Sequence, residues 1–403
     1  MCTVISQKLF FCLPKNYVDG MVGRTGSLNI PRPIAVGMRK RMVTRGAAHV
    51  KVGQLLSCRP DLIGEEAAEV FSVLRRDVPP VDRRIMEDVF TADTGMPAEC
   101  LGNIIASGSI GQVYMLLPPS KTGKFPTAVV KILRPGIVEE TNSLIDISIK
   151  RFGFSSKIVD LLEDIRNIML AEADIKTECL NMRRFRKMSN TIQIPREFKS
   201  TKNILIMQYL PVLSDPKYSE NSLKTVLTEM LIIFAKTGSI HCDLHEGNYG
   251  FTKDGKFVLY DFGSIIDIDT LAVKKIVCGI IIGNMDMIFD GVIEAELFRD
   301  SEDIDVKLNI VKFCAVLENT AKSQSDFGSL MKTLSTKTPV ATNRGFSLFR
   351  SFATMDTLLK RSGTSIEDLA PDLSRAFMFD REWLSLVSGV YQSTKLKNIL
   401  RSL

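Results

Sequence analysis

Near the middle of the chain lies the run His241-Cys242-Asp243-Leu244-His245-Glu246-Gly247-Asn248. Its first, third and eighth residues, His241, Asp243 and Asn248, form the pattern H-x-D-x-x-x-x-N. The carboxylate of Asp243 and the amide of Asn248 are five residues apart. Thirteen residues after Asn248 comes the triplet Asp261-Phe262-Gly263, which follows the apolar run Phe257–Tyr260. A carboxylate at the end of a strand is a natural ligand for Mg²⁺ beside phosphates, and an amide oxygen can be a second one. The run and the triplet together predict a magnesium–phosphate site.

Two motifs nearer the N-terminus complete the order that a protein-kinase-like fold requires. Residues 106–113 line up with the glycine-rich pattern G-x-G-x-x-G-x-V, with Ala106 in the place of the first glycine. Glycines let a loop bring its backbone and its amides close to a polyphosphate. Val129-Val130-Lys131 is similar to the V-A-I-K strand, in which a lysine among apolar residues needs an anion. Alone, each motif has an ordinary reading, as a surface turn or as an edge-strand lysine.

This resemblance to kinases implies roles for the individual residues. Asp243 would orient or deprotonate the attacking hydroxyl or water, and Asn248 and Asp261 would hold magnesium. Adenine would lie against the backbone after the β-rich run 203–209, where Met207 is equally well explained as ordinary core. The predicted nucleotide contacts are Ala106, Ser107, Gly108, Ser109, Gly111, Val113, Lys131, Met207, Gln208 and Leu210.

The order of the motifs predicts an α+β, two-lobed protein-kinase-like fold, with a small sheet lobe and a larger helical lobe. Helix-like spacing occupies 34–56 and 65–76, a hairpin and a strand fit 104–117 and 127–133, and helices follow over about 142–190. Later come a helix at 223–236, a hairpin at 249–261 and helices from Leu271. We therefore expect an irregular basic arm at 1–33, a helical extension at 34–100, a kinase-like N-lobe at 101–210 and a helical C-lobe at 211–403.

Positive charge is concentrated near the N-terminus. The 403 residues carry a net charge of +6, but the first 60 hold ten basic side chains and one acidic one, so the remainder sums to −3. Residues 32–45 could therefore face an anionic membrane surface, or could simply be a solvated basic face. Nucleic acid is not expected as a partner, because aromatic side chains are not interleaved with these charges.

Cysteine spacing and hydropathy restrict the compartment. The eight cysteines include no C-x-x-C pair, which disfavours a zinc site, and their scatter fits a reducing compartment. No apolar run reaches the ~18 residues that a membrane-spanning helix needs. We expect a cytoplasmic or peripheral membrane location.

The segment before the sheet lobe resembles one specific family. Lys51-Val52-Gly53-Gln54, and then the run 77–80, are similar to the K-x-G-Q extension of the UbiB family, atypical kinase-like proteins linked to ubiquinone biosynthesis. Glu172-Ala173-Asp174 matches the E-x-D motif of that family. The resemblance implies that Glu178 pairs with Lys131, and that the K-x-G-Q helix, with its Gln54, folds over the active site. Lys51 would there meet Glu172 and Asp174 and close the cleft.

The chain departs from these patterns at three places. Ser107 and Gly108 replace alanines of the UbiB loop, which leaves the preference between ATP and ADP open. Cys242 stands where conventional kinases carry an arginine, so we expect no guanidinium there to read an activation-loop phosphate. No A-P-E follows Gly263, so we expect no conventional platform for docking a peptide.

The leading hypothesis is a UbiB-like atypical kinase or ATPase that binds nucleotide with Mg²⁺ between two lobes. The acceptor would be water, a small or lipid-like hydroxyl, or a protein, and no protein partner can be named. The alternative is a pseudokinase scaffold in which nucleotide binding recruits a membrane or biosynthetic complex. An ordinary Ser/Thr protein kinase is disfavoured because the arginine and the A-P-E motif are missing.

Overall fold

Residue contacts in a computed structural model divide the chain into two units, and each is described by itself. Unit 1 comprises Met1–Arg183 and Pro195–Leu210, and unit 2 comprises Arg184–Ile194 and Pro211–Leu403. The expected basic arm at 1–33 lies mostly outside the described residues. The structure describes residues 30–57, 63–76, 78–117, 127–152, 156–213, 220–245, 247–298 and 342–364, and scattered positions between 310 and 386.

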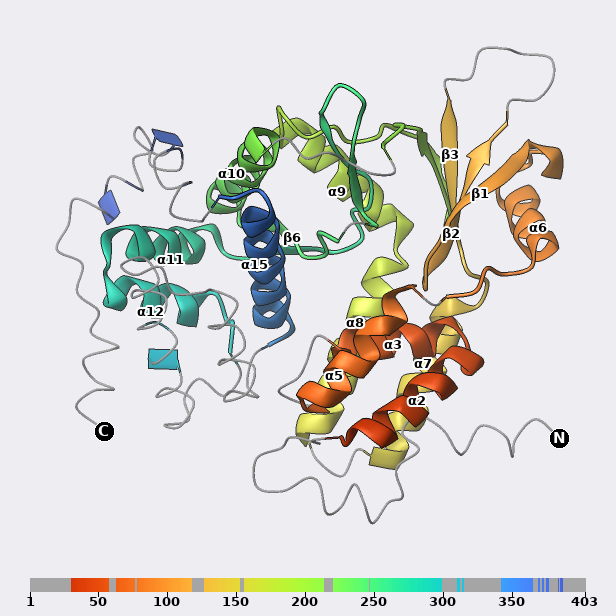
Figure 1. Cartoon of the computed structure of the whole chain (residues 1–403), viewed down its shortest axis with the longest axis horizontal. Helices are drawn as coiled ribbons and strands as arrows, with labels where there is room; N and C mark the ends of the chain where they lie inside the picture. Colours follow the sequence, from red (N-terminus) through yellow and green to blue (C-terminus); the bar gives the residue numbers. More distant parts are fainter. Residues whose placement is uncertain are drawn as a thin grey trace. The chain divides into compact units, whose positions relative to one another are not determined.

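Unit 1 contains an antiparallel sheet with the strand order β1-β2-β3-β5-β4 (Figure 1). The expected hairpin and buried strand are present, and β4 was not expected because its residues are mostly exposed and do not alternate. β3 is buried except at Lys131, which is partly exposed. The strands are β1 (Leu101–Ser107), β2 (Gly111–Leu116), β3 (Ala128–Leu133), β4 (Glu197–Ser200) and β5 (Ile204–Gln208).

Helix α6 (Arg83–Thr94) supplies apolar side chains to the core of this sheet (Figure 1). Met86 and Phe90 are fully buried and pack in one cluster with Tyr114 and Val130. Asp82 caps the start of α6 by accepting a hydrogen bond from the N–H of Arg84, which satisfies one of the unpaired amides of the first turn. The core therefore fixes β2, which follows the predicted phosphate-binding loop, and β3, which carries Lys131.

The helical extension is divided where glycine permits a left-handed backbone. One helix was expected over 34–56, but Gly46, with φ 118°, separates two helices. The segment 65–76 is helical as expected, although its last four residues form a 3₁₀ turn. The helices of unit 1 are α2 (Arg32–Arg45), α3 (Ala47–Ser57), α5 (Glu65–Ser72), η2 (Val73–Arg76), α7 (Ile137–Phe152), α8 (Ser156–Glu172) and α9 (Ile175–Met188), and α9 continues into unit 2.

Unit 2 is mainly helical and contains two small antiparallel pairs, β6 with β9 and β7 with β8. Gly238, with φ 72°, allows the tight turn from α10 into β6, where a Cβ atom would lie 1.9 Å from the carbonyl oxygen of Ile268. The expected hairpin over 249–261 is present as β7 and β8. The elements are α10 (Glu220–Thr237), β6 (Ser239–His241), β7 (Tyr249–Phe251), β8 (Phe257–Leu259), β9 (Ile265–Asp267), α11 (Thr270–Ile282), α12 (Met285–Glu294) and α15 (Asn343–Arg361).

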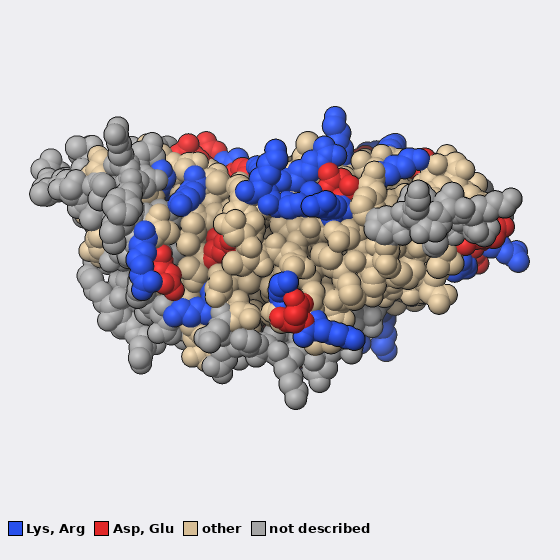
Figure 2. Space-filling view, turned by 90° about the horizontal axis from the view of Figure 1, so that it is seen from above, with Lys and Arg blue, Asp and Glu red and all other residues tan. Residues whose placement is uncertain are grey.

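One face of the molecule carries side chains of both signs of charge among uncharged residues (Figure 2). On the face drawn in Figure 2, Lys and Arg side chains form one larger group with a few Asp and Glu side chains beside it. Within the described part of the chain, no helix combines the length and the hydropathy that a bilayer crossing requires.

Candidate active site

In unit 1, the strand lysine and the helix glutamate form a buried ion pair. Lys131 Nζ lies 2.7 Å and 2.9 Å from the two carboxylate oxygens of Glu178, which belongs to α9. The Glu178 side chain is fully buried and that of Lys131 is 12% exposed. The pairing implied by the UbiB resemblance is therefore present. A buried ion pair contributes little net stability, because desolvation offsets the attraction, so its presence in β3 suggests a role beyond folding.

The glycine-rich loop is the turn between β1 and β2, closed by the N–H of Gly108 donating to the carbonyl of Gly111 at 2.9 Å. Gly111 has no room for a side chain, since a Cβ atom there would lie 2.8 Å from the carbonyl oxygen of Ile132. A Cβ atom at Gly108 would lie 3.4 Å from its nearest atom, an ordinary contact. The glycine that distinguishes this loop from the alanine-rich form is therefore not required by the turn.

Arg134, at the end of β3, holds the loop from one side. Its backbone N–H donates to the carbonyl of Ile110, and its Nε donates to the carbonyl of Gly108, both at 2.9 Å. Its Nη2 donates to Ser107 Oγ at 3.1 Å and to the carbonyl of Pro79 at 2.8 Å. Sequence reasoning missed Arg134, although its position three residues after Lys131 was a usable signal.

The K-x-G-Q helix α3 contacts the same loop within unit 1. Ser109 Oγ donates to Gln54 Oε1 at 3.3 Å, and Gln54 Nε2 donates to the carbonyl of Leu74 at 2.9 Å. Gly53 lets α3 approach its neighbours closely, because a Cβ atom there would lie 2.7 Å from the sulfur of Met42. The helix that the resemblance implies folds over the active site is thus joined to the glycine-rich loop through Gln54.

Lys51 meets one of the two carboxylates expected for it. Its Nζ lies 2.5 Å from Glu172 Oε2, and both side chains are largely buried. Asp174 instead caps α9: its Oδ1 accepts hydrogen bonds from the N–H groups of Lys176 and Thr177, and its Oδ2 accepts one from the Thr177 hydroxyl. The hydrogen bond from the Thr177 hydroxyl is the main cause of the lowered pKa of Asp174. The E-x-D motif therefore supplies one carboxylate to Lys51 and one to the start of the helix that carries Glu178.

The end of β5 offers one backbone donor to a base. Met207 is buried in the sheet, and its ordinary packing explains its position. The N–H of Gln208 donates to Arg196, and the N–H of Tyr209 donates to Thr127. This leaves the N–H of Leu210 as a donor that no described residue accepts.

In unit 2, a buried histidine joins the two acidic motifs. His241 Nε2 donates to the carbonyl of Asp261 at 2.8 Å, and His241 Nδ1 accepts from the N–H of Asp243 at 3.2 Å. The ring is therefore the neutral tautomer with its proton on Nε2, as its hydrogen-bond network assigns it. Burial lowers the pKa of His241 and keeps it neutral. The N–H of Cys242 also donates to the carbonyl of Ser264. Two links therefore hold the run 241–248, which corresponds in sequence to the catalytic loop of kinases, beside the triplet.

Asn248 and Asp261 provide hard oxygen donors in unit 2. Asn248 Nδ2 donates to the carbonyl of Asp243 at 2.9 Å, so Oδ1 is the atom left to bind a cation. Asp261 Oδ1 accepts from the N–H of Gly263 at 3.0 Å. The described residues contain no cluster of three His, Cys, Asp or Glu that could cage a metal. One carboxylate and one amide oxygen fit Mg²⁺, which takes its remaining ligands from water and phosphates.

His245 is a second polar group beside Asp243 that sequence reasoning did not single out. The N–H of Gly247 donates to His245 Nδ1 at 2.9 Å, which places the proton of the neutral ring on Nε2. That Nε2 lies 3.6 Å from Asp243 Oδ2. A Cβ atom at position 247 would lie 2.7 Å from the His245 ring, which explains the glycine in the run 241–248.

Residue 242 supplies no guanidinium, as expected, but an arginine that the sequence analysis did not single out lies beside this loop. Arg350 of α15 lies against the loop, with its Nε donating to the carbonyl of Cys242 at 2.8 Å. Its Nη2 donates to Ser264 Oγ at 3.4 Å and lies 3.8 Å from Asp243 Oδ1. Cys242 itself is fully buried, and burial raises the pKa of its thiol to about 12, so it is a neutral packing residue.

The sequence is similar to a family model and to several known proteins. The model of the ABC1 atypical kinase-like domain matches residues 73–289, more than half of the chain. An uncharacterised protein of Synechocystis sp. is 28% identical over 63% of this chain and 70% of its own length. A probable protein kinase UbiB of Shewanella piezotolerans is 26% identical over 54% of this chain, which spans 44% of that protein. Three other relatives are spanned over 53%, 47% and 36% of their lengths.

The fold is also found among solved structures. A Mycobacterium tuberculosis protein solved in complex with erythromycin matches 82% of this chain and 92% of its own, with a TM-score of 0.52 and 19% identity. At this identity the likeness concerns the fold alone. The kinase-like α+β fold expected from the order of the motifs is confirmed.

Proposed function

The chain belongs to the ABC1 atypical kinase-like family, and from that premise and the geometry above we propose that it binds a magnesium–nucleotide and transfers or hydrolyses its terminal phosphoryl group. The observation that carries the proposal is the ion pair between Lys131 and Glu178. A fully buried glutamate holds the ammonium in one place on β3, as a kinase lysine must be held to meet phosphate oxygens. The loop 106–111 would cover those phosphates with its backbone.

The catalytic part of the proposal concerns unit 2. Asp243 would orient or deprotonate the attacking hydroxyl or water, and Asn248 and Asp261 would hold Mg²⁺. The bound magnesium would neutralise the charge that develops on the phosphoryl oxygens. The hydrogen bond from Asn248 Nδ2 to the carbonyl of Asp243 supports this assignment, because it orients the amide oxygen and ties the metal ligand to the catalytic residue.

A nucleotide-binding and turnover assay tests the proposal. The parent chain should bind ATP with Mg²⁺ and release phosphate or transfer it, whereas Asp243→Asn should still bind nucleotide but lose turnover. Asp254→Asn is the matched control, because Asp254 is an exposed carboxylate in the β7–β8 turn, paired with Lys256. If Asp243→Asn hydrolyses ATP at the parental rate, the catalytic assignment is wrong. Comparison of ATP with ADP settles the nucleotide preference.

A second function, nucleotide-gated scaffolding, is favoured by the contacts of α3. The bond between Gln54 and Ser109 ties the K-x-G-Q helix to the glycine-rich loop, and the ion pair of Lys51 with Glu172 fixes the same helix against α8. A nucleotide that moves the loop would therefore move α3, and binding alone could signal to a membrane or biosynthetic complex such as one of ubiquinone or lipid metabolism. Single-turnover assays with and without anionic liposomes separate the two functions, since a scaffold binds nucleotide without consuming it in either condition.

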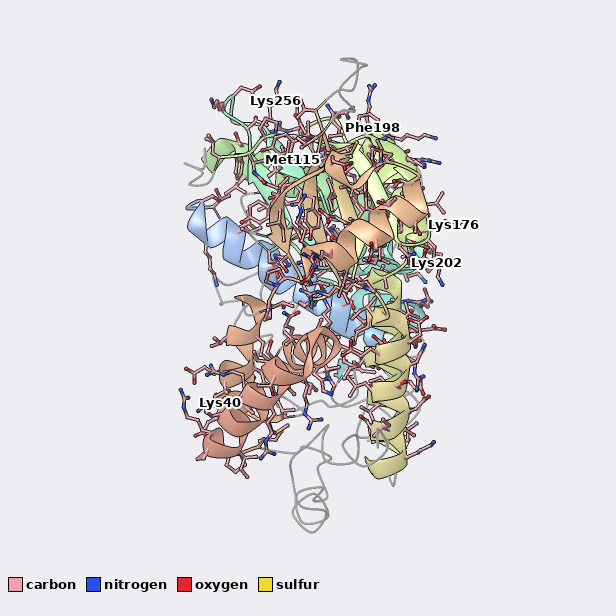
Figure 3. All side chains as sticks on the ribbon, turned by 90° about the vertical axis from the view of Figure 1, so that its right-hand side faces the viewer. Lys40, Met115, Lys176, Phe198, Lys202 and Lys256 are labelled. Atoms are coloured by element: carbon pink, nitrogen blue, oxygen red, sulfur yellow. The ribbon has the colours of Figure 1, made fainter. Side chains whose placement is uncertain are left out.

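We also propose that α2 contacts an anionic membrane surface. Lys40 and Arg41 are exposed on this helix, and Lys40 points outward in Figure 3. The first turn is less available for this role, because Arg32 forms an ion pair with Glu69 of α5. The membrane-facing part of the helix would then be its second half, around residues 39–45.

A further inference from the structure

The catalytic loop of unit 2 is contacted by a helix that lies outside the matched family domain. The family model ends at residue 289, whereas α15 spans Asn343–Arg361. This helix packs beside β6 and β9, the two strands that flank the catalytic loop and the triplet (Figure 1). Two consecutive α15 residues, Arg350 and Ser351, reach the loop backbone.

Arg350 connects the loop to the residue that follows the triplet. Its Nε donates to the carbonyl of Cys242, and its Nη2 donates to the hydroxyl of Ser264, the residue after Asp261-Phe262-Gly263. The same Nη2 lies 3.8 Å from Asp243 Oδ1. The side chain is 16% exposed, so these contacts are made largely out of water, where hydrogen bonds to a charged group are strong.

The neighbouring residue strengthens the attachment of the helix. Ser351, which is fully buried, donates its hydroxyl hydrogen to the carbonyl of His241 at 2.7 Å. His241 in turn joins the backbone of Asp243 to that of Asp261. Helix α15 therefore holds the loop at two successive carbonyls, those of His241 and Cys242. A movement of α15 would shift the backbone beside Asp243 and with it the Asp243 carboxylate.

The guanidinium beside this loop comes from a different position than in conventional kinases. Conventional kinases place an arginine at this position and pair it with a phosphate on the activation loop. Here Cys242 is a small buried thiol, and the guanidinium arrives from position 350, already hydrogen-bonded to both segments. The planar guanidinium donates to several acceptors at once, which a lysine ammonium at the same place could not do with the same geometry.

We propose that Arg350 is a positioning residue, which sets the Asp243 carboxylate for phosphoryl transfer by clamping the catalytic loop to the segment after the triplet. The clamp is permanent and requires no phosphorylation, and it makes α15 a structural part of the catalytic apparatus. The inference rests on the proposed function for its effect on turnover. Its effect on the loop backbone is independent of whether the chain turns over nucleotide.

The test compares three variants of the full chain: Arg350→Met, Arg350→Lys and Arg344→Met. Arg344 lies on the same helix and is 45% exposed, with only an exposed ion pair to Glu296, so its loss should leave turnover unchanged. Misplacing a catalytic group by about 1 Å costs about 10²-fold in rate, which is the fall in kcat expected for Arg350→Met. Arg350→Lys should recover little of it, while all variants bind one equivalent of Mg²⁺–ATP with an affinity within twofold of the parent.

Hydrogen exchange of the backbone amides provides the second readout. The amides of Cys242, Asp243 and Gly263 should exchange faster in Arg350→Met and at the parental rate in Arg344→Met, because their bonds depend on the clamp. If the parent itself does not turn over nucleotide, the proposed function fails, and the exchange rates alone decide the positioning role. Parental exchange at these amides in Arg350→Met, or kcat within twofold of an active parent, overturns the inference.

Discussion

Breaking the Lys131–Glu178 pair from one side should be more damaging than removing it altogether. Lys131→Met leaves the fully buried Glu178 carboxylate, and Glu178→Leu leaves a lysine whose side chain is only 12% exposed. Because so little solvent reaches the pair, either single change should cost about 3–5 kcal/mol. At ~2–4 °C per kcal/mol for a unit of this size, the Tm should fall by roughly 6–20 °C.

The double variant Lys131→Met/Glu178→Leu should recover most of that loss. An apolar pair of similar volume is often neutral or stabilising relative to a buried ion pair, because neither charge then has to be desolvated. Thermal unfolding of the two single variants and the double variant gives the coupling between the residues. The double variant should nevertheless lose the rise in Tm that Mg²⁺–ATP gives the parent, since stability would be restored without the phosphate-binding ammonium.

Lys275 provides the matched control for this experiment. Its side chain is 13% exposed and its Nζ lies 2.6 Å from Glu294, so Lys275→Met removes a lysine from a similar environment in unit 2. It should lower the Tm while preserving the nucleotide-dependent rise. The reasoning is refuted if Lys131→Met is as stable as the parent, or if the double variant keeps the full nucleotide-dependent rise in Tm.

Three further predictions concern the loop, a buried histidine and the basic helix. Gly111→Ala should lower the Tm markedly, because its Cβ atom would lie 2.8 Å from a backbone carbonyl, whereas Gly108→Ala should change the Tm little; equal effects would contradict this. Burial lowers the folded-state pKa of His241, so the stability it confers is complete above its ordinary value of about 6.5 and is lost as the pH falls toward the folded pKa. Urea unfolding between pH 5 and 7.5 should show this slope in the parent and not in His241→Gln. Neutralising residues 39–41 should weaken flotation with anionic vesicles about 100-fold, at ~1 kcal/mol for each charge, and unchanged flotation would remove the membrane proposal.

Much of the fold could be predicted because its signals are local. The glycine-rich hairpin, the lysine strand and the β7–β8 turn are each encoded within about a dozen consecutive residues, and their order along the chain indicated the kinase-like fold. The edge strand β4 could not be found in this way, since its residues are mostly exposed and show no alternation. The break at Gly46 was missed because the apolar spacing continues across it, and only the backbone conformation reveals two helices.

The ion pairs of the candidate site could be predicted from a family resemblance, whereas two of its arginines could not. The partners of Lys131 and Lys51 followed from motifs already known in a family, so a resemblance could place Glu178 and Glu172. Arg134 directly follows the predicted strand at 127–133, and only the structure shows that its side chain turns back to the loop. Arg350 is 108 residues from the carbonyl it contacts, and nothing in its own neighbourhood distinguishes it from other helix arginines.

Cys242 shows that a group missing from one position of a motif can be supplied from a distant position in the chain. Position 242 has no arginine. The carbonyl of that residue nevertheless has a guanidinium donor, because Arg350 reaches it from α15. A hydrogen bond to a charged group contributes about 1.5–3 kcal/mol whether its donor is adjacent or distant. Residue 242 is a small buried thiol, and the guanidinium that donates to its carbonyl belongs to Arg350. A motif search reads only the residue at position 242, whereas the packing of unit 2 shows that Arg350 supplies the donor.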